Sequence, residues 1–141
     1  MTMGERDVAE AAIGRVIMEF FHCLDDTQFD ALVQLFAPEG VWHRQGQVLR
    51  GRAMVREALA RRPAGTVTRH LVTNLLVTHL EDERSVAKFY MTVFRREADT
   101  LVDGPVPMEL PHMVAACEMV LAYLGNAWRI MELKAVPSFR R

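Results

Sequence analysis

A carboxylate and an imidazole from distant parts of this chain have the residue types of a general-base pair. His70 lies in the stretch TRHLVTN, residues 68–74, whose Val and Thr residues favour a β-strand. Asp25 lies at the end of an apolar helical pattern. The helix dipole does not favour an anion there, and Asp26 and Thr27 can cap the next helix, so neither of these structural roles explains Asp25. A carboxylate beside the imidazole would fix its tautomer and make the ring a general base. A lone histidine in a strand is more often structural, so the residues alone leave both possibilities open.

Other kinds of catalytic or binding site have weaker support in the sequence. No two of the five histidines have the i, i+4 spacing that places metal ligands on one face of a helix. The two cysteines, Cys23 and Cys117, lie far apart and form no CxxC motif. The sequence has no GxGxxG, P-loop or GxSxG motif. We therefore expect neither a metal nor an organic cofactor.

Three helical segments precede the stretches that favour strands. Apolar residues recur at helical spacing from Glu5 to about Asp25. Further helical patterns cover residues 28–36 and 51–63. Between these two, residues 41–51 look like two short extended pieces around Gln45-Gly46.

Four long segments rich in β-branched and aromatic residues follow the helices. They cover residues 66–80, 85–97, 112–125 and 127–137. Turn-like breaks separate them, which favours an antiparallel sheet. Helices followed by a run of strands indicate an α+β fold, with the helices packed on one face of the sheet. The 141 residues fit one domain, residues 1–141.

Strand alternation predicts which side chains lie beside His70. A period of two residues places His70 and Asn74 on one face of the strand and Arg69 on the opposite face. If the face of His70 is turned toward the helices, Asp25 and His70 converge at the mouth of an interior cavity.

Composition and charge argue against several classes of protein. Seventeen basic and eighteen acidic residues give a net charge of -1, which does not favour nucleic-acid binding. The N-terminal sequence MTMGERDVAEAA lacks the apolar region of a signal peptide, and no apolar run approaches the roughly 20 residues of a membrane span. We expect a soluble, cytoplasmic protein with reduced cysteines.

The long strands are apolar on both faces, which predicts a homo-oligomer formed through the outer face of the sheet.

Two segments carry a resemblance to a known superfamily: LDDTQFDALVQLFAPEGVW, residues 24–42, and TRHLVTN. With the order of helices and strands, they resemble the nuclear-transport-factor-2-like (NTF2-like) superfamily. Within it, they resemble the SnoaL-like branch that includes scytalone dehydratase and hexachlorocyclohexane dehydrochlorinase. The resemblance implies a cone-shaped α+β domain. About three N-terminal helices would pack on a strongly curved, mostly antiparallel sheet and enclose a pocket.

The resemblance also implies roles for particular residues. In branch members with lyase activity, an aspartate at the end of the first helix binds a histidine on the first long strand, and this histidine removes a proton from the substrate. These positions correspond to Asp25 and His70, and Trp42 matches an aromatic residue of the pocket wall. The implied function is a cofactor-independent lyase or isomerase, such as a dehydratase or cyclase, acting on a small, largely apolar or aromatic molecule. The alternative is a non-catalytic ligand-binding or oligomer-forming subunit, related to the small subunit of ring-hydroxylating dioxygenases.

Further residues are candidates for the pocket wall, although the apolar ones belong to the core more often than to a pocket. The dehydrochlorinase uses a strand arginine near the leaving group, for which Arg129 is the candidate here. Other candidate substrate-binding residues are Met18, Phe21, Asn74, Tyr90, Met113 and Cys117. Scytalone dehydratase also has pocket tyrosines and a second histidine, for which this chain offers Tyr90, Tyr123, His43 and His112.

Overall fold

The computed structural model describes all residues from 1 to 141, and it begins with a long helix, α1 (Met3–Asp25). This helix starts at a capping box, in which Thr2 accepts a hydrogen bond from the backbone N–H of Glu5 and the Glu5 carboxylate accepts one from the backbone N–H of Thr2. Its buried residues recur at helical spacing: Ala9, Ile13, Ile17, Phe20, Phe21 and Leu24. No helix of the structure combines the length and the apolar character needed to cross a membrane.

Two short helices and a β-hairpin follow α1. They are α2 (Phe29–Gln34), β1 (Phe36–Arg44), β2 (Gln47–Arg50) and α3 (Gly51–Ala60). Gln45 and Gly46 connect the two strands with φ angles of 51° and 77°, which the favoured two-residue hairpin turn requires. The second helix ends earlier than the sequence pattern predicts, because the chain already enters β1 at Phe36.

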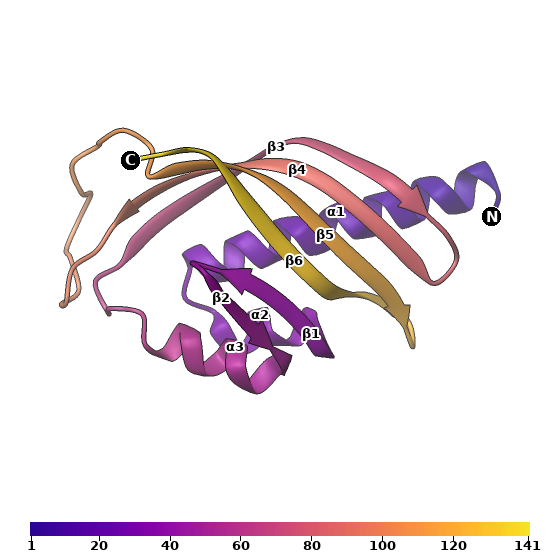
Figure 1. Ribbon diagram of the computed structural model, residues 1–141, viewed down its shortest axis with the longest axis horizontal. Helices are drawn as coiled ribbons and strands as arrows, with labels where there is room; N and C mark the ends of the chain where they lie inside the picture. Colours follow the sequence, from indigo (N-terminus) through magenta and orange to yellow (C-terminus); the bar gives the residue numbers. More distant parts are fainter.

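Four long strands complete a six-stranded sheet. They are β3 (Val67–Leu80), β4 (Arg84–Arg96), β5 (Met113–Leu124) and β6 (Ala127–Arg140). The strand order is β2-β1-β6-β5-β4-β3, and every neighbouring pair is antiparallel except β1 and β6. The sheet curves over α1, whereas α2 and α3 lie beside β1 and β2 (Figure 1). The predicted α+β fold, with helices packed on a curved and mostly antiparallel sheet, is confirmed.

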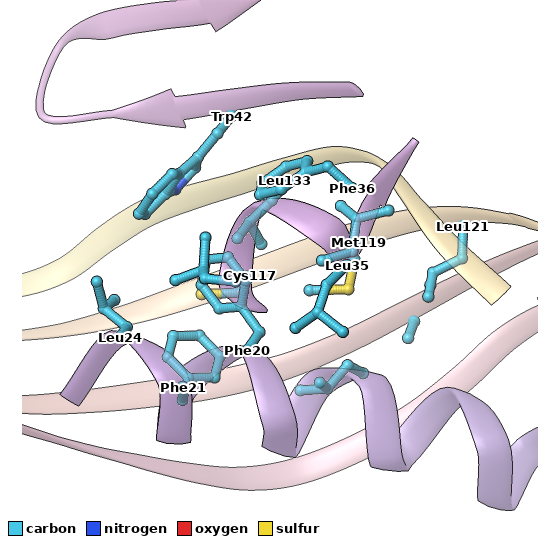
Figure 2. Close-up of a cluster of buried hydrophobic side chains, with 14 of the residues drawn as sticks. Phe20, Phe21, Leu24, Leu35, Phe36, Trp42, Cys117, Met119, Leu121 and Leu133 are labelled. Carbon is cyan, nitrogen blue, oxygen red and sulfur yellow. The ribbon is translucent and has the colours of Figure 1, made fainter. Parts of the chain in front are cut away.

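The hydrophobic core lies between α1 and the inner face of the sheet (Figure 2). Phe20 is fully buried, and its ring packs edge-to-face on Phe36 and Trp42, with ring centres 5.9 Å and 5.2 Å away. Met119 and Leu121 of β5 belong to the same cluster. Full burial of such a side chain contributes roughly 1.5–3 kcal/mol. The cluster therefore holds the C-terminal half of α1 firmly against the sheet.

Strand β3 contains an irregularity that changes which of its side chains face inward. Its pairing with β4 shifts register between residues 73 and 76, and Asn74 has a φ angle of 56°. A β-bulge adds an unpaired residue and interrupts the alternation of faces. Val72 packs against the core before the bulge and Val77 packs against it afterwards. Asn74 itself is exposed at this bulge, so it does not join the inward side chains beside His70.

Candidate functional site

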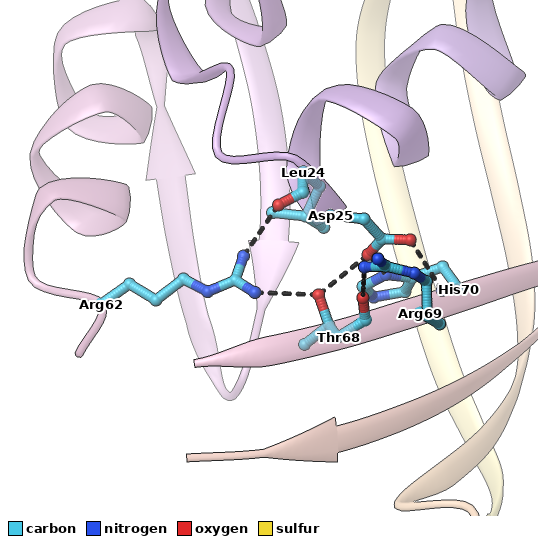
Figure 3. Close-up of polar contacts among 6 residues, drawn as sticks. All are labelled: Leu24, Asp25, Arg62, Thr68, Arg69 and His70. Atoms are coloured by element: carbon cyan, nitrogen blue, oxygen red, sulfur yellow. Dashed lines mark hydrogen bonds and ion pairs between the residues drawn. The ribbon is translucent and has the colours of Figure 1, made fainter. Parts of the chain in front are cut away.

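Asp25 and His70 meet where the C-terminal end of α1 lies against the start of β3 (Figure 3). Oδ1 of Asp25 lies 2.5 Å from Nδ1 of His70, and Oδ2 accepts a hydrogen bond of 2.9 Å from the backbone N–H of His70. The two side chains are largely buried, with 11% and 9% of their surfaces exposed. The carboxylate therefore holds His70 by its ring and by its backbone.

A hydroxyl and a guanidinium support this carboxylate. The Thr68 hydroxyl donates to Oδ1 of Asp25 over 2.8 Å and accepts from Nη2 of Arg62 over 2.8 Å. Nη1 of Arg62 donates to the carbonyl oxygen of Leu24 over 3.0 Å. That carbonyl is one of those that the end of a helix leaves without an intrahelical partner. Arg62, which follows α3, thus ties the end of α1 to β3 and fixes the position of Asp25 (Figure 3).

The hydrogen-bond network decides which atoms carry protons. Burial by itself raises the pKa of the Asp25 carboxyl. Hydrogen bonds from the side chain and backbone of His70, the charge of His70 and the hydrogen bond from Thr68 outweigh burial and hold that pKa below its ordinary value. Asp25 is therefore a carboxylate at neutral pH and accepts from each of these partners. In the neutral imidazole the proton then lies on Nδ1, and Nε2 keeps the lone pair that a base needs.

His70 lines a cavity of about 670 Å³ between α1, the β1–β2 hairpin and the inner face of the sheet. Its size falls within the roughly 300–1,000 Å³ of ordinary small-molecule sites. Apolar side chains form much of the wall, among them Phe20, Leu24, Met91, Val93 and Leu133. An imidazole with a free Nε2 on such a wall can remove a proton from a carbon atom of an apolar ligand.

Four of the candidate wall residues line this cavity together with His70. They are Phe21, Trp42, Met113 and Cys117. Phe21 lies beside the imidazole, with the two ring centres 5.1 Å apart and the planes inclined by 33°. Burial raises the pKa of the Cys117 thiol to about 12. Cys117 therefore stays protonated at neutral pH and serves as an apolar part of the wall rather than as a nucleophile.

The other four candidates lie outside this cavity. Met18 and Tyr90 are 39% and 52% exposed, because Met18 lies beside the buried stripe of α1 and Tyr90 alternates with the inward residues of β4. The bulge in β3 displaces Asn74. Arg129 lines a separate hollow beside the N-terminal half of α1, which Tyr123 lines as well. None of these four belongs to the site that surrounds His70.

The arginines of the cavity are not among the residues expected from the sequence. Arg95 of β4 continues the inward row of Phe89, Met91 and Val93, so strand alternation is a sufficient signal to find it. Arg44 ends β1 and Arg62 follows α3. Their positions depend on how the hairpin and α3 pack, and no local pattern in the sequence reports that packing.

Two further histidines, His43 and His112, also line the cavity. Nε2 of His43 lies 3.0 Å from Oε2 of Glu132, and this hydrogen bond is the main reason that the pKa of Glu132 is lowered. The two side chains are 32% and 36% exposed, so this pair is more open to solvent than Asp25 and His70. No group of three or more His, Cys, Asp or Glu side chains in the structure is arranged to hold a metal ion.

Known proteins share this sequence pattern and this fold. The profile of the SnoaL-like domain matches residues 8–134, whereas no curated protein sequence matches the chain significantly. Among solved structures, a protein from Catenulispora acidiphila is 23% identical, with a TM-score of 0.74 and coverage of 94% of both chains. A structure from the same organism in complex with S-DNPA is 22% identical, with a TM-score of 0.71, and the match covers 93% of this chain and 94% of that chain.

A third similar structure is the beta subunit of a candidate aromatic-ring-hydroxylating dioxygenase from Novosphingobium aromaticivorans. It is 18% identical, with a TM-score of 0.75, and the match covers 96% of this chain and 93% of that chain. At such identities the structural likeness establishes the fold and leaves the reaction open. The family match, by contrast, spans most of the sequence. The chain therefore belongs to the SnoaL-like domain family of the NTF2-like superfamily.

Proposed function

We propose that this protein is a cofactor-independent lyase or isomerase in which His70 is the general base and Asp25 orients it. The observation that carries the proposal is the 2.5 Å contact between Nδ1 of His70 and Oδ1 of Asp25 on the wall of a cavity of about 670 Å³. The contact leaves Nε2 of His70 without a partner in the protein. The apolar wall favours a small, largely apolar or aromatic substrate.

In the proposed reaction, Nε2 of His70 takes a proton from a carbon next to an activating group such as a carbonyl. The electrons of the C–H bond move toward the activating group and leave an enolate. In a dehydration, these electrons re-form the carbonyl and expel hydroxide from the neighbouring carbon, and the hydroxide leaves as water with the proton that His70 had taken. In an isomerisation, the enolate takes that proton back at another carbon. Either route regenerates the base. Asp25 keeps the ring in place and stabilises the imidazolium that forms.

Proton exchange tests the base without knowledge of the leaving group. The protein is incubated in heavy water with a panel of small apolar ketones, such as 2-tetralone, and proton NMR follows the loss of signal from the hydrogens next to the carbonyl. We expect the wild type to accelerate this exchange. His70→Ala should slow it by about 10²–10⁴-fold, the usual contribution of general acid–base catalysis.

His79→Ala is the matched control for this experiment. His79 lies on the same strand and also contacts a carboxylate, with Nε2 3.1 Å from Oε1 of Glu81, but both side chains are exposed. This variant should exchange at the wild-type rate. Equal rates in the wild type and in His70→Ala would contradict the proposed base. No exchange above the buffer rate with any ketone of the panel would favour a non-catalytic subunit.

The outer face of the sheet supports that second candidate function, an oligomer-forming subunit. Tyr90 of β4 and Val136 of β6 are 52% and 65% exposed. Both pair with Ala116 of β5, so the three residues form one exposed apolar row across neighbouring strands. Such surfaces often mark protein interfaces. We propose that this row mediates contact between copies of the chain, whether or not the cavity is catalytic.

Light scattering after size-exclusion chromatography tests the proposed contact. The wild type should have a mass above that of one chain, and Tyr90→Lys should shift it toward the monomer because a buried lysine charge would lack a partner. Leu101→Lys is the control, since Leu101 is 85% exposed in the loop between β4 and β5. A monomeric wild type would contradict the proposed assembly.

A further inference from the structure

The wall of the cavity concentrates positive charge. Four arginines line it, Arg44 from β1, Arg62 after α3, Arg95 from β4 and Arg140 from β6, whereas no aspartate or glutamate does. The whole chain has a net charge of -1. The excess of positive charge is therefore a property of the cavity and not of the protein in general.

The arginines differ in how the protein uses their charge. Arg62 donates to Leu24 and Thr68, and Arg95 contacts the carboxylate of Glu97. The side chain of Arg44 has neither a hydrogen bond nor an ion pair. Its guanidinium instead lies over the ring of Trp42, 5.3 Å from the ring centre. Arg44 is thus a cation beside an apolar wall, with all N–H groups of its guanidinium left for a ligand or for water.

The guanidinium groups are close enough to repel one another. Burial is the largest cause that lowers the pKa of Arg44, and the charges of Arg95 and Arg62 lower it further, with no carboxylate opposing them. Burial and Arg95 likewise lower the pKa of Arg62, while Asp25 and Glu97 oppose the shift. A partly buried charge without a counterion is unfavourable, and low-dielectric walls strengthen its field in the cavity. A bound anion would relieve this repulsion, whereas a neutral ligand would not.

Resting on the function proposed above for the same cavity, we propose that its ligand is an organic acid whose carboxylate is bound by Arg44 and Arg95. The apolar body of the acid lies against the wall that includes Phe21 and Met91. A guanidinium matches the planar geometry of a carboxylate and can bind both of its oxygens. Trp42 supports the guanidinium of Arg44 from one side, and this contact orients it.

Two probes of nearly the same shape and different charge test this proposal. They are naphthalene-2-carboxylate and naphthalene-2-carboxamide, titrated separately into the protein by isothermal calorimetry near neutral pH and at low salt. We expect the carboxylate to bind the wild type at least about tenfold more tightly than the amide. The preference should decline as salt is added, because ions screen the arginine charges.

Substitutions then assign the preference to particular residues. Arg44→Gln should reduce the preference for the carboxylate to about twofold or less and leave the affinity for the amide nearly unchanged. Arg44→Lys, which keeps the charge and loses the planar fork, should retain an intermediate preference. Arg96→Gln is the matched control, since Arg96 is the exposed neighbour of Arg95 and lies outside the cavity. It should bind both probes as the wild type does.

Several outcomes would overturn the proposal. These are equal or tighter binding of the amide to the wild type, no binding of either probe, and an undiminished preference in both Arg44→Gln and Arg95→Gln. This binding test is independent of the proton-exchange test of His70 as the base, because His70→Ala should still bind the carboxylate probe more tightly than the amide. Loss of proton exchange is thus read from the His70 variant, and loss of acid recognition from the arginine variants.

Discussion

Strand β3 carries a histidine–carboxylate pair near each of its ends. Near the start, His70 and Asp25 are 2.5 Å apart and 9% and 11% exposed. At the far end, His79 and Glu81 are 3.1 Å apart and 49% and 66% exposed. Asp25 comes from a helix remote in sequence, whereas Glu81 is only two residues from its histidine. The residue types are nearly the same, so the difference between the pairs lies in their surroundings.

Those surroundings change the physical character of the contact. In the buried pair, Asp25 accepts from the His70 ring, the His70 backbone and Thr68, and the low local dielectric strengthens each of these bonds. In the exposed pair, water competes for the same groups, and such contacts contribute about 0–1 kcal/mol. Of the two histidines, only His70 lines the cavity of about 670 Å³. Burial, additional donors and an adjacent chamber therefore distinguish a potential catalytic pair from a surface contact.

Removal of the Asp25 charge should have the largest effect on this comparison. Asp25→Asn keeps the shape of the side chain but can no longer stabilise an imidazolium or hold Nδ1 as the protonated nitrogen. We expect ketone proton exchange to fall by about 10²–10⁴-fold, while circular dichroism shows a folded protein. Glu81→Gln should exchange at the wild-type rate. A wild-type rate in Asp25→Asn would show that burial of the pair has no catalytic consequence.

Loss of the Thr68 hydroxyl should affect stability more than loss of the same group elsewhere on β3. Thr68 is 2% exposed and joins Arg62 to Asp25. Thr68→Val leaves both charged partners with one hydrogen bond fewer, which should lower the free energy of unfolding by about 1–3 kcal/mol. Thr78→Val, at an exposed position on the same strand, should change it by no more than about 0.5 kcal/mol. Urea unfolding of both variants measures the difference, and equal changes would contradict the role of the Thr68 bridge.

The pH dependence of stability gives a subtler test of the buried pair. The pKa of Asp25 is lowered in the folded protein, so folding favours its carboxylate. This stabilisation is complete above the unfolded-state pKa of about 3.9, and it is lost as the pH falls through the lower folded-state pKa. The free-energy difference between the wild type and Asp25→Asn should therefore be larger near neutral pH than near about pH 3. A difference independent of pH in urea unfolding would show that folding does not favour the carboxylate.

Removal of the exposed imidazole should have the smallest effect. His79→Ala breaks a contact between two solvated side chains, and we expect the free energy of unfolding to change by less than about 1 kcal/mol. Thermal unfolding at low and high salt measures this change. A larger loss would mean that the two ends of β3 are more alike than their exposure indicates.

Neighbouring residues of β4 show how far alternation can predict the site. Tyr90 lies between the inward residues Phe89 and Met91, and the structure places it on the outer face. The same two-residue period, counted on from Phe89 and Met91, places Arg95 on the inner face, where it lines the cavity. A consistent use of the strand period therefore selects Arg95 and rejects Tyr90. The period fails at Asn74, because a bulge depends on pairing with the next strand and leaves no clear mark in the sequence.

Local patterns in the sequence were enough to predict the helices, the long strands and their α+β arrangement, whereas the pairing of Asp25 with His70 was implied by the resemblance to SnoaL-like proteins. The helices, the strands and their arrangement depend on periodic burial and on chain order, which neighbouring residues record directly. Alternation places Arg95 on the inner face of β4, but only the tertiary structure brings Arg44 and Arg62 to the same cavity and moves Arg129 to another hollow. These arginines come from separate elements. The distances between their side chains depend on how a hairpin, a short helix and a curved sheet pack together. No periodicity within a single segment encodes that packing.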